Sequence, residues 1–208
     1  MNELCGILRT MRLGRGSLDF DLPEPEVLLD LQGRPEAILR AERNLAHMII
    51  EEFMIAANEA VAEHLESLGV PSLYRIHEEP DPMKLEDIMK VVHPAAKMKK
   101  KALKAGDFSR LLAEVKGTPG EEIINYMILR SLKQARYSPV NVGHFGLASS
   151  CYTHFTSPIR RYPDLVVHRI LREALTRKRL SDKRTKELEA MLPDIAFHSS
   201  RMERLADE

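Results

Sequence analysis

The stretch GHFGLASSCYTHFTSPIRRYPDLVVHRIL, residues 143–171, joins a loop-forming half to a helix-forming half. Up to Tyr162, glycine, proline, serine, threonine and aromatic residues are mixed without a helical period, which predicts loop and short strand. After Pro163, apolar residues recur at helical spacing and predict a helix over residues 164–175. The sequence therefore predicts a loop that leads directly into a helix.

The end of this loop carries groups that suit a phosphate. Ser157, Arg160 and Arg161 bring a hydroxyl and two guanidinium groups close to the backbone N–H donors of a helix start. Arg160 is the candidate for stabilising negative charge at an attacked phosphorus. Rings that can stack on unpaired bases of single-stranded RNA are interleaved with these donors: His144, Phe145, Tyr152, His154, Phe155 and Tyr162.

The same residues also fit structural roles. The pattern fits equally well a turn in which one arginine pairs with a carboxylate such as Asp164. Phe145 and Phe155 fit a core role better than base stacking, because aromatic side chains bury large areas. His168 lies on the following helix, where a single histidine is more often a packing or surface residue.

Composition limits the classes of function. The 208 residues include 44% hydrophobic residues, enough for one domain with a sizeable core. Lysine plus arginine equals aspartate plus glutamate at 31 each, so any site for a polyanion must be local. Cys5 and Cys151 are far apart in sequence, which favours a reducing compartment, and we expect the cytoplasm. No apolar run approaches the roughly 20 residues of a membrane-spanning helix. The basic segment 97–104 is interpreted as a solvated face rather than an RNA site.

The remaining sequence predicts an α+β fold that is predominantly helical, with a few short strands, in one unit. Short strands are predicted at residues 17–20 and 27–33, and an extended segment at residues 71–82. Helices are predicted at residues 2–12, from Pro35 to Leu68, and at residues 84–92, 107–117 with Asp107 as N-cap, 118–137 and 187–207.

The quoted stretch resembles the signature of the RNase R/RNase II family, whose members share HFGL, an aromatic-rich stretch, TSPIRRYPDL and a following HR. Four other segments agree in the family's order: RNLAHMIIEEFMIAANEAVA (43–62), LYRIHEEPDP (73–82), MILRSLKQARYSP (127–139) and MERLADE (202–208). The resemblance covers nearly the whole chain. It implies that residues 1–208 are the C-terminal part of the family's catalytic RNB domain.

The resemblance implies a processive, hydrolytic 3′-to-5′ exoribonuclease. Such an enzyme threads single-stranded RNA into a channel, releases nucleoside 5′-monophosphates and uses divalent metals, usually Mg²⁺. Arg160 matches the family's arginine at the scissile phosphate. Glu51, with Glu52 as its alternative, matches a position near the 3′-terminal nucleotides. The other residues that match the signature are candidates for RNA contacts: His144, Tyr152, Ser157, Arg161 and Arg169.

The family's metal-binding aspartate cluster, of the form DxxxxxDxDDA, is not found in this sequence. Asp19 and Asp21 are interpreted as an ordinary strand end instead. The upstream cold-shock-type modules and the downstream S1-type module of the family are not found either. We therefore expect a chain that begins inside the catalytic domain, holds no Mg²⁺ by itself and has little nuclease activity alone.

Two other functions compete with an enzyme fragment. The missing aspartates and the zero net charge favour a non-catalytic RNA-binding or interaction module derived from the same domain. A purely structural helical domain is the third interpretation. The expected partners are single-stranded RNA and the missing upstream half of the catalytic domain. Self-association is also expected, because a domain cut through its core exposes apolar surface.

Overall fold

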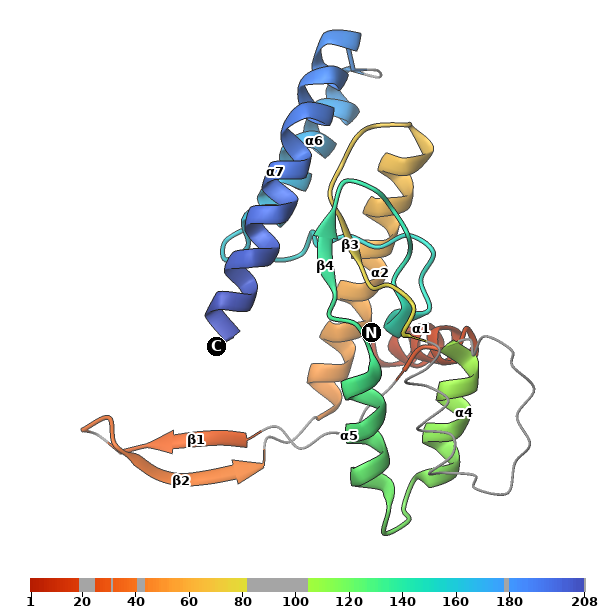
Figure 1. The fold of residues 1–208 in the computed structure, drawn as a ribbon, viewed down its shortest axis with the longest axis vertical. Coiled ribbons are helices and arrows are strands. Elements are labelled where there is room, and N and C mark those ends of the chain that lie inside the picture. Colours follow the sequence, from red (N-terminus) through yellow and green to blue (C-terminus); the bar gives the residue numbers. More distant parts are fainter. Residues whose placement is uncertain (19–24, 31, 41–43, 82–104, 178–179, 208) are drawn as a thin grey trace.

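The computed structural model describes residues 1–18, 25–30, 32–40, 44–81, 105–177 and 180–207 (Figure 1). The expected fold class, α+β and predominantly helical with a few short strands, is confirmed. The elements are α1 Asn2–Gly14, β1 Pro25–Leu29, β2 Pro35–Arg40, α2 Leu45–Ser67, β3 Tyr74–Ile76, α4 Ala105–Val115, α5 Glu121–Ser131, β4 Arg136–Ser138, the 3-10 turn η1 Phe145–Leu147, α6 Tyr162–Arg177 and α7 Asp182–Asp207. No helix within these ranges is long and apolar enough to cross a membrane.

The segment before α2 is a β-hairpin, so the predicted helix from Pro35 was wrong over Pro35–Arg40. β1 pairs antiparallel with β2, with Val27 opposite Ile38. The strands are joined by a turn with Gly33 at a φ of +76°, a backbone conformation that favours glycine. In the hairpin, the backbone N–H and C=O groups form hydrogen bonds across the strands instead of the internal hydrogen bonds of a helix. The helix instead begins at Leu45, after Asn44 accepts the N–H of His47 at 3.1 Å as N-cap.

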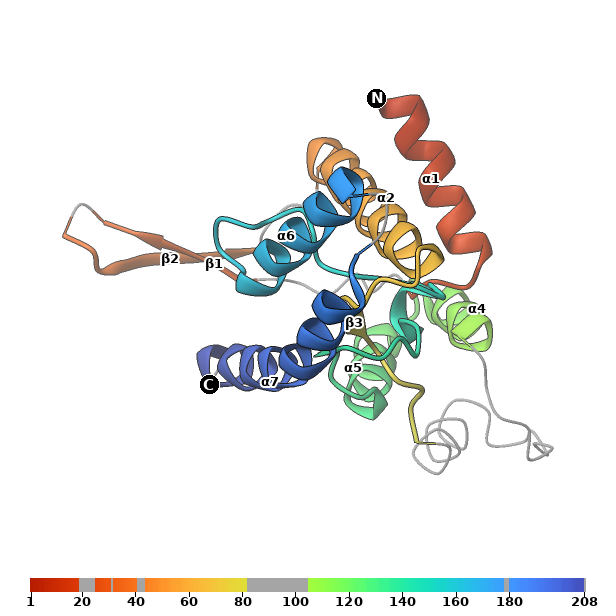
Figure 2. The ribbon, with the colours of Figure 1, turned by 90° about the horizontal axis from the view of Figure 1, so that it is seen from above.

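The hairpin projects away from the helices (Figures 1 and 2). It exposes apolar side chains. Val27 and Ile38 share one face, and Leu28 lies on the other. All three are at least 40% exposed. A two-stranded hairpin is marginally stable by itself, so this surface suits coverage by another segment or chain. Self-association stays a prediction.

Helices α2, α6 and α7 share the larger hydrophobic core. Leu65 of α2, Val167 of α6 and Leu188 of α7 are fully buried together. Burial of each such side chain contributes about 2 kcal/mol. Because α6 begins directly after the predicted loop, this core fixes the end of the loop.

Helix α5 ends before residue 137 because the chain then pairs in the small sheet β3–β4. Residues 118–137 were predicted as one helix, but α5 stops at Ser131 and β4 follows. Tyr74 of β3 lies opposite Ser138 of β4 in an antiparallel pair. The backbone N–H of Tyr137 donates to Ser200 Oγ on α7 at 2.9 Å. These long-range partners outweigh the local helical pattern.

Several other expectations are settled in part. The helices predicted near residues 2–12, 164–175 and 187–207 are confirmed as α1, α6 and α7, and β3 lies in the predicted extended segment. Asp107 lies in the first turn of α4 rather than before it, because α4 already begins at Ala105. Three predictions lie wholly or partly outside the described residues: the strand at 17–20, the helix at 84–92 and the basic segment 97–104.

Helix α1 is attached to α2 by a buried ion pair. Arg12 and Glu52 are 3% and 2% exposed, and Arg12 Nη2 lies 2.6 Å from Glu52 Oε1. Arg12 Nη1 also donates to Ser17 Oγ at 2.8 Å, and that hydroxyl donates to the carbonyl of Gly146 at 3.2 Å. The pair therefore connects two helices with the HFGL segment of the loop.

Removing one member of this pair should destabilise the fold. We expect Glu52→Gln to lower the free energy of unfolding by about 3 kcal/mol, because it removes the carboxylate closest to the buried Arg12 charge. Glu59→Gln is the control: it breaks the pair with Arg15, whose side chain is 44% exposed. That change should cost less than about 1 kcal/mol. Urea unfolding measures both, and equal losses would contradict a special role for the buried pair.

Candidate functional site

The HFGL segment is clamped to the chain that follows β3. The backbone N–H of Phe145 donates to the carbonyl of His77 at 2.8 Å, and the N–H of Gly146 donates to His77 Nδ1 at 3.1 Å. A Cβ atom at Gly146 would lie 3.0 Å from His77 Nδ1, so a larger residue would press against the His77 ring. Phe145 packs edge-on against Phe108 of α4 in a second core. The start of the loop is therefore rigidly held.

Rings of the loop pack against one another beneath its surface. The ring centroids of His77 and His144 are 5.1 Å apart, and those of His144 and Tyr152 are 5.3 Å apart. Tyr152 is 5.9 Å from His154, which is 5.6 Å from Tyr137. A hydrogen bond of 2.9 Å joins the Tyr137 hydroxyl to His154 Nδ1. These edge-to-face contacts form a ring array that supports the loop from below.

Two histidines of this array are held in the neutral state. Burial, followed by the charge of His77, lowers the pKa of His144 to about 3. Burial, followed by the charge of Arg161, lowers the pKa of His154 to about 2. Neither imidazole exchanges a proton near neutral pH, so their contribution is packing and hydrogen bonding rather than general acid–base chemistry.

A buried carboxylate closes the second half of the loop. Asp164, in the first turn of α6, has no exposed surface. Its Oδ1 accepts the N–H of Ser157 at 2.9 Å and a hydrogen from Arg161 Nη2 at 2.8 Å. The structural interpretation of one arginine paired with Asp164 therefore describes Arg161. A phosphate at this point would share a guanidinium group that is already engaged.

Arg160 is placed differently from its neighbour. Its backbone N–H donates to the carbonyl of Ser157 at 3.3 Å, while its side chain is exposed. Within the described part of the chain, no carboxylate forms an ion pair with it. Ile159 and Tyr162 beside it are also exposed. The apex of the loop thus presents one available guanidinium group on a fixed backbone.

The remaining candidates differ in how accessible their side chains are. Glu51 of α2 is 39% exposed and lies 3.9 Å from Arg12 Nη2, whereas Glu52 is consumed by its buried ion pair. Of these two glutamates, only Glu51 offers accessible side-chain surface. His144 and Tyr152 lie beneath the loop, in the ring array.

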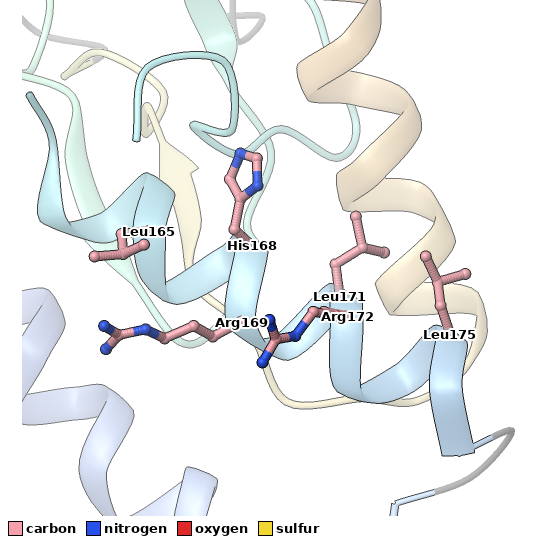
Figure 3. A pocket seen from close by; sticks show the side chains of 6 residues that line it. All are labelled: Leu165, His168, Arg169, Leu171, Arg172 and Leu175. Atoms are coloured by element: carbon pink, nitrogen blue, oxygen red, sulfur yellow. The ribbon is translucent and has the colours of Figure 1, made fainter. Parts of the chain in front are cut away.

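Arg169 lies on the exposed side of α6, beside a groove of about 470 Å³ (Figure 3). The ring of His168, also in the groove wall, stacks on Phe155 at 3.9 Å, and its Nε2 lies 2.8 Å from the Phe155 carbonyl. Phe155 in turn packs against the larger core. The preference for core roles at Phe145 and Phe155, and for a packing role at His168, is confirmed.

Sequence reasoning missed Asn58, which lies in the middle of α2 and is 2% exposed. Its side chain bonds to Tyr152 and to the backbone of Phe155. Asparagine is a poor helix former, and here it occupies a position between Ile55 and Ala62 on the buried stripe of α2. A polar residue on an otherwise apolar helical stripe was the feature of the sequence that could have identified Asn58.

The described residues do not fit a divalent metal site. No three histidine, cysteine, aspartate or glutamate side chains among them lie close enough to hold a metal ion. Asp19 and Asp21 lie outside the described residues.

Acid should destabilise the fold through these neutral histidines. An unfolded histidine has a pKa near 6.5, above the folded values of His144 and His154, so the unfolded state binds more protons as pH falls below about 6.5. Between pH 7.5 and 5 each should cost about 2 kcal/mol. His154→Gln should flatten this dependence in denaturant titrations, whereas His198→Gln, at an exposed position on α7, should not. Equal pH dependence in both variants would refute the neutral state of His154.

Three comparisons place the chain among known proteins. A family model described as RNB domain matches residues 1–177. Ribonuclease R of Aquifex aeolicus is 46% identical over 210 residues, which cover 100% of this chain and 29% of the relative. The chain thus spans less than a third of that relative.

Solved structures agree. The chain is similar to Mycoplasma genitalium RNase R in complex with ribose methylated single-stranded RNA, with a TM-score of 0.90 and 32% identity over 97% of this chain and 32% of that one. The same enzyme in complex with double-stranded RNA matches with a TM-score of 0.89. A more distant match is yeast Ssd1, a pseudonuclease, with a TM-score of 0.62 and 25% identity over 77% of this chain and 20% of that one. The family model over most of the chain and the 46% identical ribonuclease R show that this chain belongs to the RNB-domain family.

Proposed function

We propose that this chain forms the phosphate-binding part of a 3′-to-5′ exoribonuclease that acts on single-stranded RNA and releases nucleoside 5′-monophosphates. The observation that carries the proposal is Arg160, an exposed guanidinium group without a carboxylate partner among the described residues, at the apex of a loop held at both ends. A fixed cation of this kind suits a phosphate whose negative charge increases during hydrolysis.

Other residues act around Arg160 in this proposal. Ser157 and Arg161 shape the turn, and Arg161 adds positive charge although it pairs with Asp164. Glu51 and Arg169 are assigned to nucleotides next to the scissile phosphate, since both have accessible side chains. The single-stranded RNA in the Mycoplasma genitalium relative supports RNA as the ligand. Free, buried cysteines suit the proposed cytoplasmic location.

Mg²⁺ enters the proposal only with the intact enzyme. When bound, such a metal activates water and stabilises the leaving oxygen. The described residues do not supply its ligands, so we assign the ligands to the upstream half of the catalytic domain. That half is the proposed protein partner, and the chain alone is proposed to hydrolyse little RNA.

A second candidate is a non-catalytic RNA-binding module. The likeness to yeast Ssd1, a pseudonuclease, and the lack of a metal-ligand cluster in the described residues favour it. Both candidates use the same Arg160 loop for RNA. They differ in whether the loop can complete a hydrolytic site.

Replacing the exposed arginine should weaken RNA binding. We expect Arg160→Ala to lower the affinity for a single-stranded oligo(A) about tenfold and to reduce the slope of log K against log salt by about 0.7, the value for one phosphate contact. Arg110→Ala, at an 82% exposed arginine of α4, is the control and should leave both unchanged. Fluorescence anisotropy over a salt series measures them. If Arg160→Ala does not change the affinity, both proposed functions are contradicted, because both use Arg160 to bind RNA.

The two candidates separate in a chimera. With a 5′-labelled oligo(A) and Mg²⁺, we expect this chain alone to give no shortening from the 3′ end. Placed in Aquifex aeolicus ribonuclease R instead of the matching 210 residues, it should support Mg²⁺-dependent shortening. Arg160→Ala in the chimera should abolish most of that activity. Shortening by the isolated chain would contradict the proposed need for an upstream half, and a folded but inactive chimera would favour the non-catalytic module.

A further inference from the structure

Asn58 joins α2 to both ends of a four-residue segment in the loop. Its Nδ2 donates to the Tyr152 hydroxyl at 2.9 Å, and its Oδ1 accepts the backbone N–H of Phe155 at 2.9 Å. Asn58 is 2% exposed, so both bonds are shielded from water. A buried hydrogen bond of this kind cannot be replaced by solvent when one partner is lost.

The segment that Asn58 holds leads directly to the phosphate loop. Thr153 inside it donates its hydroxyl hydrogen to the Leu73 carbonyl at 2.6 Å, and the Phe155 carbonyl lies 2.8 Å from His168 Nε2. Five residues after Phe155 the chain reaches Arg160. Asn58 therefore fixes the entrance of the loop from α2, as Asp164 fixes its exit from α6.

The chemistry of asparagine matches this task. An amide offers one donor and one acceptor group without charge, which the phenol and the backbone N–H require together. Packing alone would favour an apolar residue here, as at Ile55 and Ala62 on the same stripe. A buried amide without partners would cost about 1–3 kcal/mol. The two hydrogen bonds to Tyr152 and Phe155 therefore explain the asparagine at this position, whereas the packing of α2 does not.

We propose that Asn58 is a positioning residue that orients the Arg160 loop for RNA. The proposal rests on the proposed function, because it concerns the same phosphate site. It assigns Asn58 no contact with RNA. Its effect passes through Tyr152 and Phe155 to the backbone that presents Arg160.

The test compares two buried asparagines in the full 208-residue chain. Asn58→Leu keeps similar volume and removes both bonds. Asn125→Leu is the matched control, because Asn125 is also buried in a helix, α5, at 4% exposed. We expect Asn58→Leu to weaken oligo(A) binding about tenfold at temperatures where both variants are folded by circular dichroism. Asn125→Leu should bind like the wild type.

A double variant separates positioning from general destabilisation. If Asn58 acts through Arg160, then Asn58→Leu combined with Arg160→Ala should bind no more weakly than Arg160→Ala alone. Additive losses would overturn the proposal, as would an Asn58→Leu variant that binds normally. Should Asn58→Leu fail to fold, Tyr152→Phe removes one of the two bonds and keeps the ring. It should weaken binding by a smaller factor, again without addition to Arg160→Ala.

Limited trypsin digestion tests the loop without RNA. Asn58→Leu should speed cleavage after Arg160 and Arg161 at least severalfold relative to cleavage after Arg110, and Asn125→Leu should not. Mass spectrometry identifies the sites. Unchanged loop cleavage overturns the role of Asn58 whatever the RNA result. If Arg160→Ala binds oligo(A) as tightly as the wild type does, the proposed function is refuted instead. The tryptic cleavage rates then still show whether Asn58 holds the loop.

Discussion

A buried polar group must find a partner inside the protein, and this constraint holds the segments around α2 in place. Glu52 meets it by pairing with Arg12, which brings α1 onto the helix and reaches Gly146 through Ser17. Asn58, six residues further along, meets it by bonding the loop. Apolar packing stabilises α2, and Glu52 and Asn58 attach α1 and the loop to it.

The same constraint explains why neighbouring arginines differ. Asp164 is buried at the start of α6 and takes Arg161 and the Ser157 N–H as partners. Arg160, one position earlier, turns outward with its charge available. The neutral rings of His144 and His154 add support below without adding charge. A chain with zero net charge can thus carry a local concentration of positive charge, because Asp164 pairs with Arg161 and leaves Arg160 exposed.

Membership of the RNB-domain family and the geometry of the loop both support the proposal that this chain forms the phosphate-binding half of a nuclease site. The other half needs several carboxylates that converge on metal ions. Within the described residues, such a cluster is not formed. In the proposed function, this chain contributes the loop, its supporting rings and the two helices that fix it.

Local patterns in the sequence determined the helices α6 and α7, the loop before α6 and the family signature around Arg160. Apolar spacing and proline positions act over a few residues, so they can be read directly. The sequence left open whether an arginine of this loop pairs with Asp164, and the structure shows that Arg161 does. Tertiary structure alone decided that Pro35 opens a strand, that Tyr137 joins β3 rather than α5, and that Asn58 meets Tyr152, 94 residues distant. Those outcomes depend on contacts between segments far apart in the chain, and a local pattern of apolar residues does not contain that information.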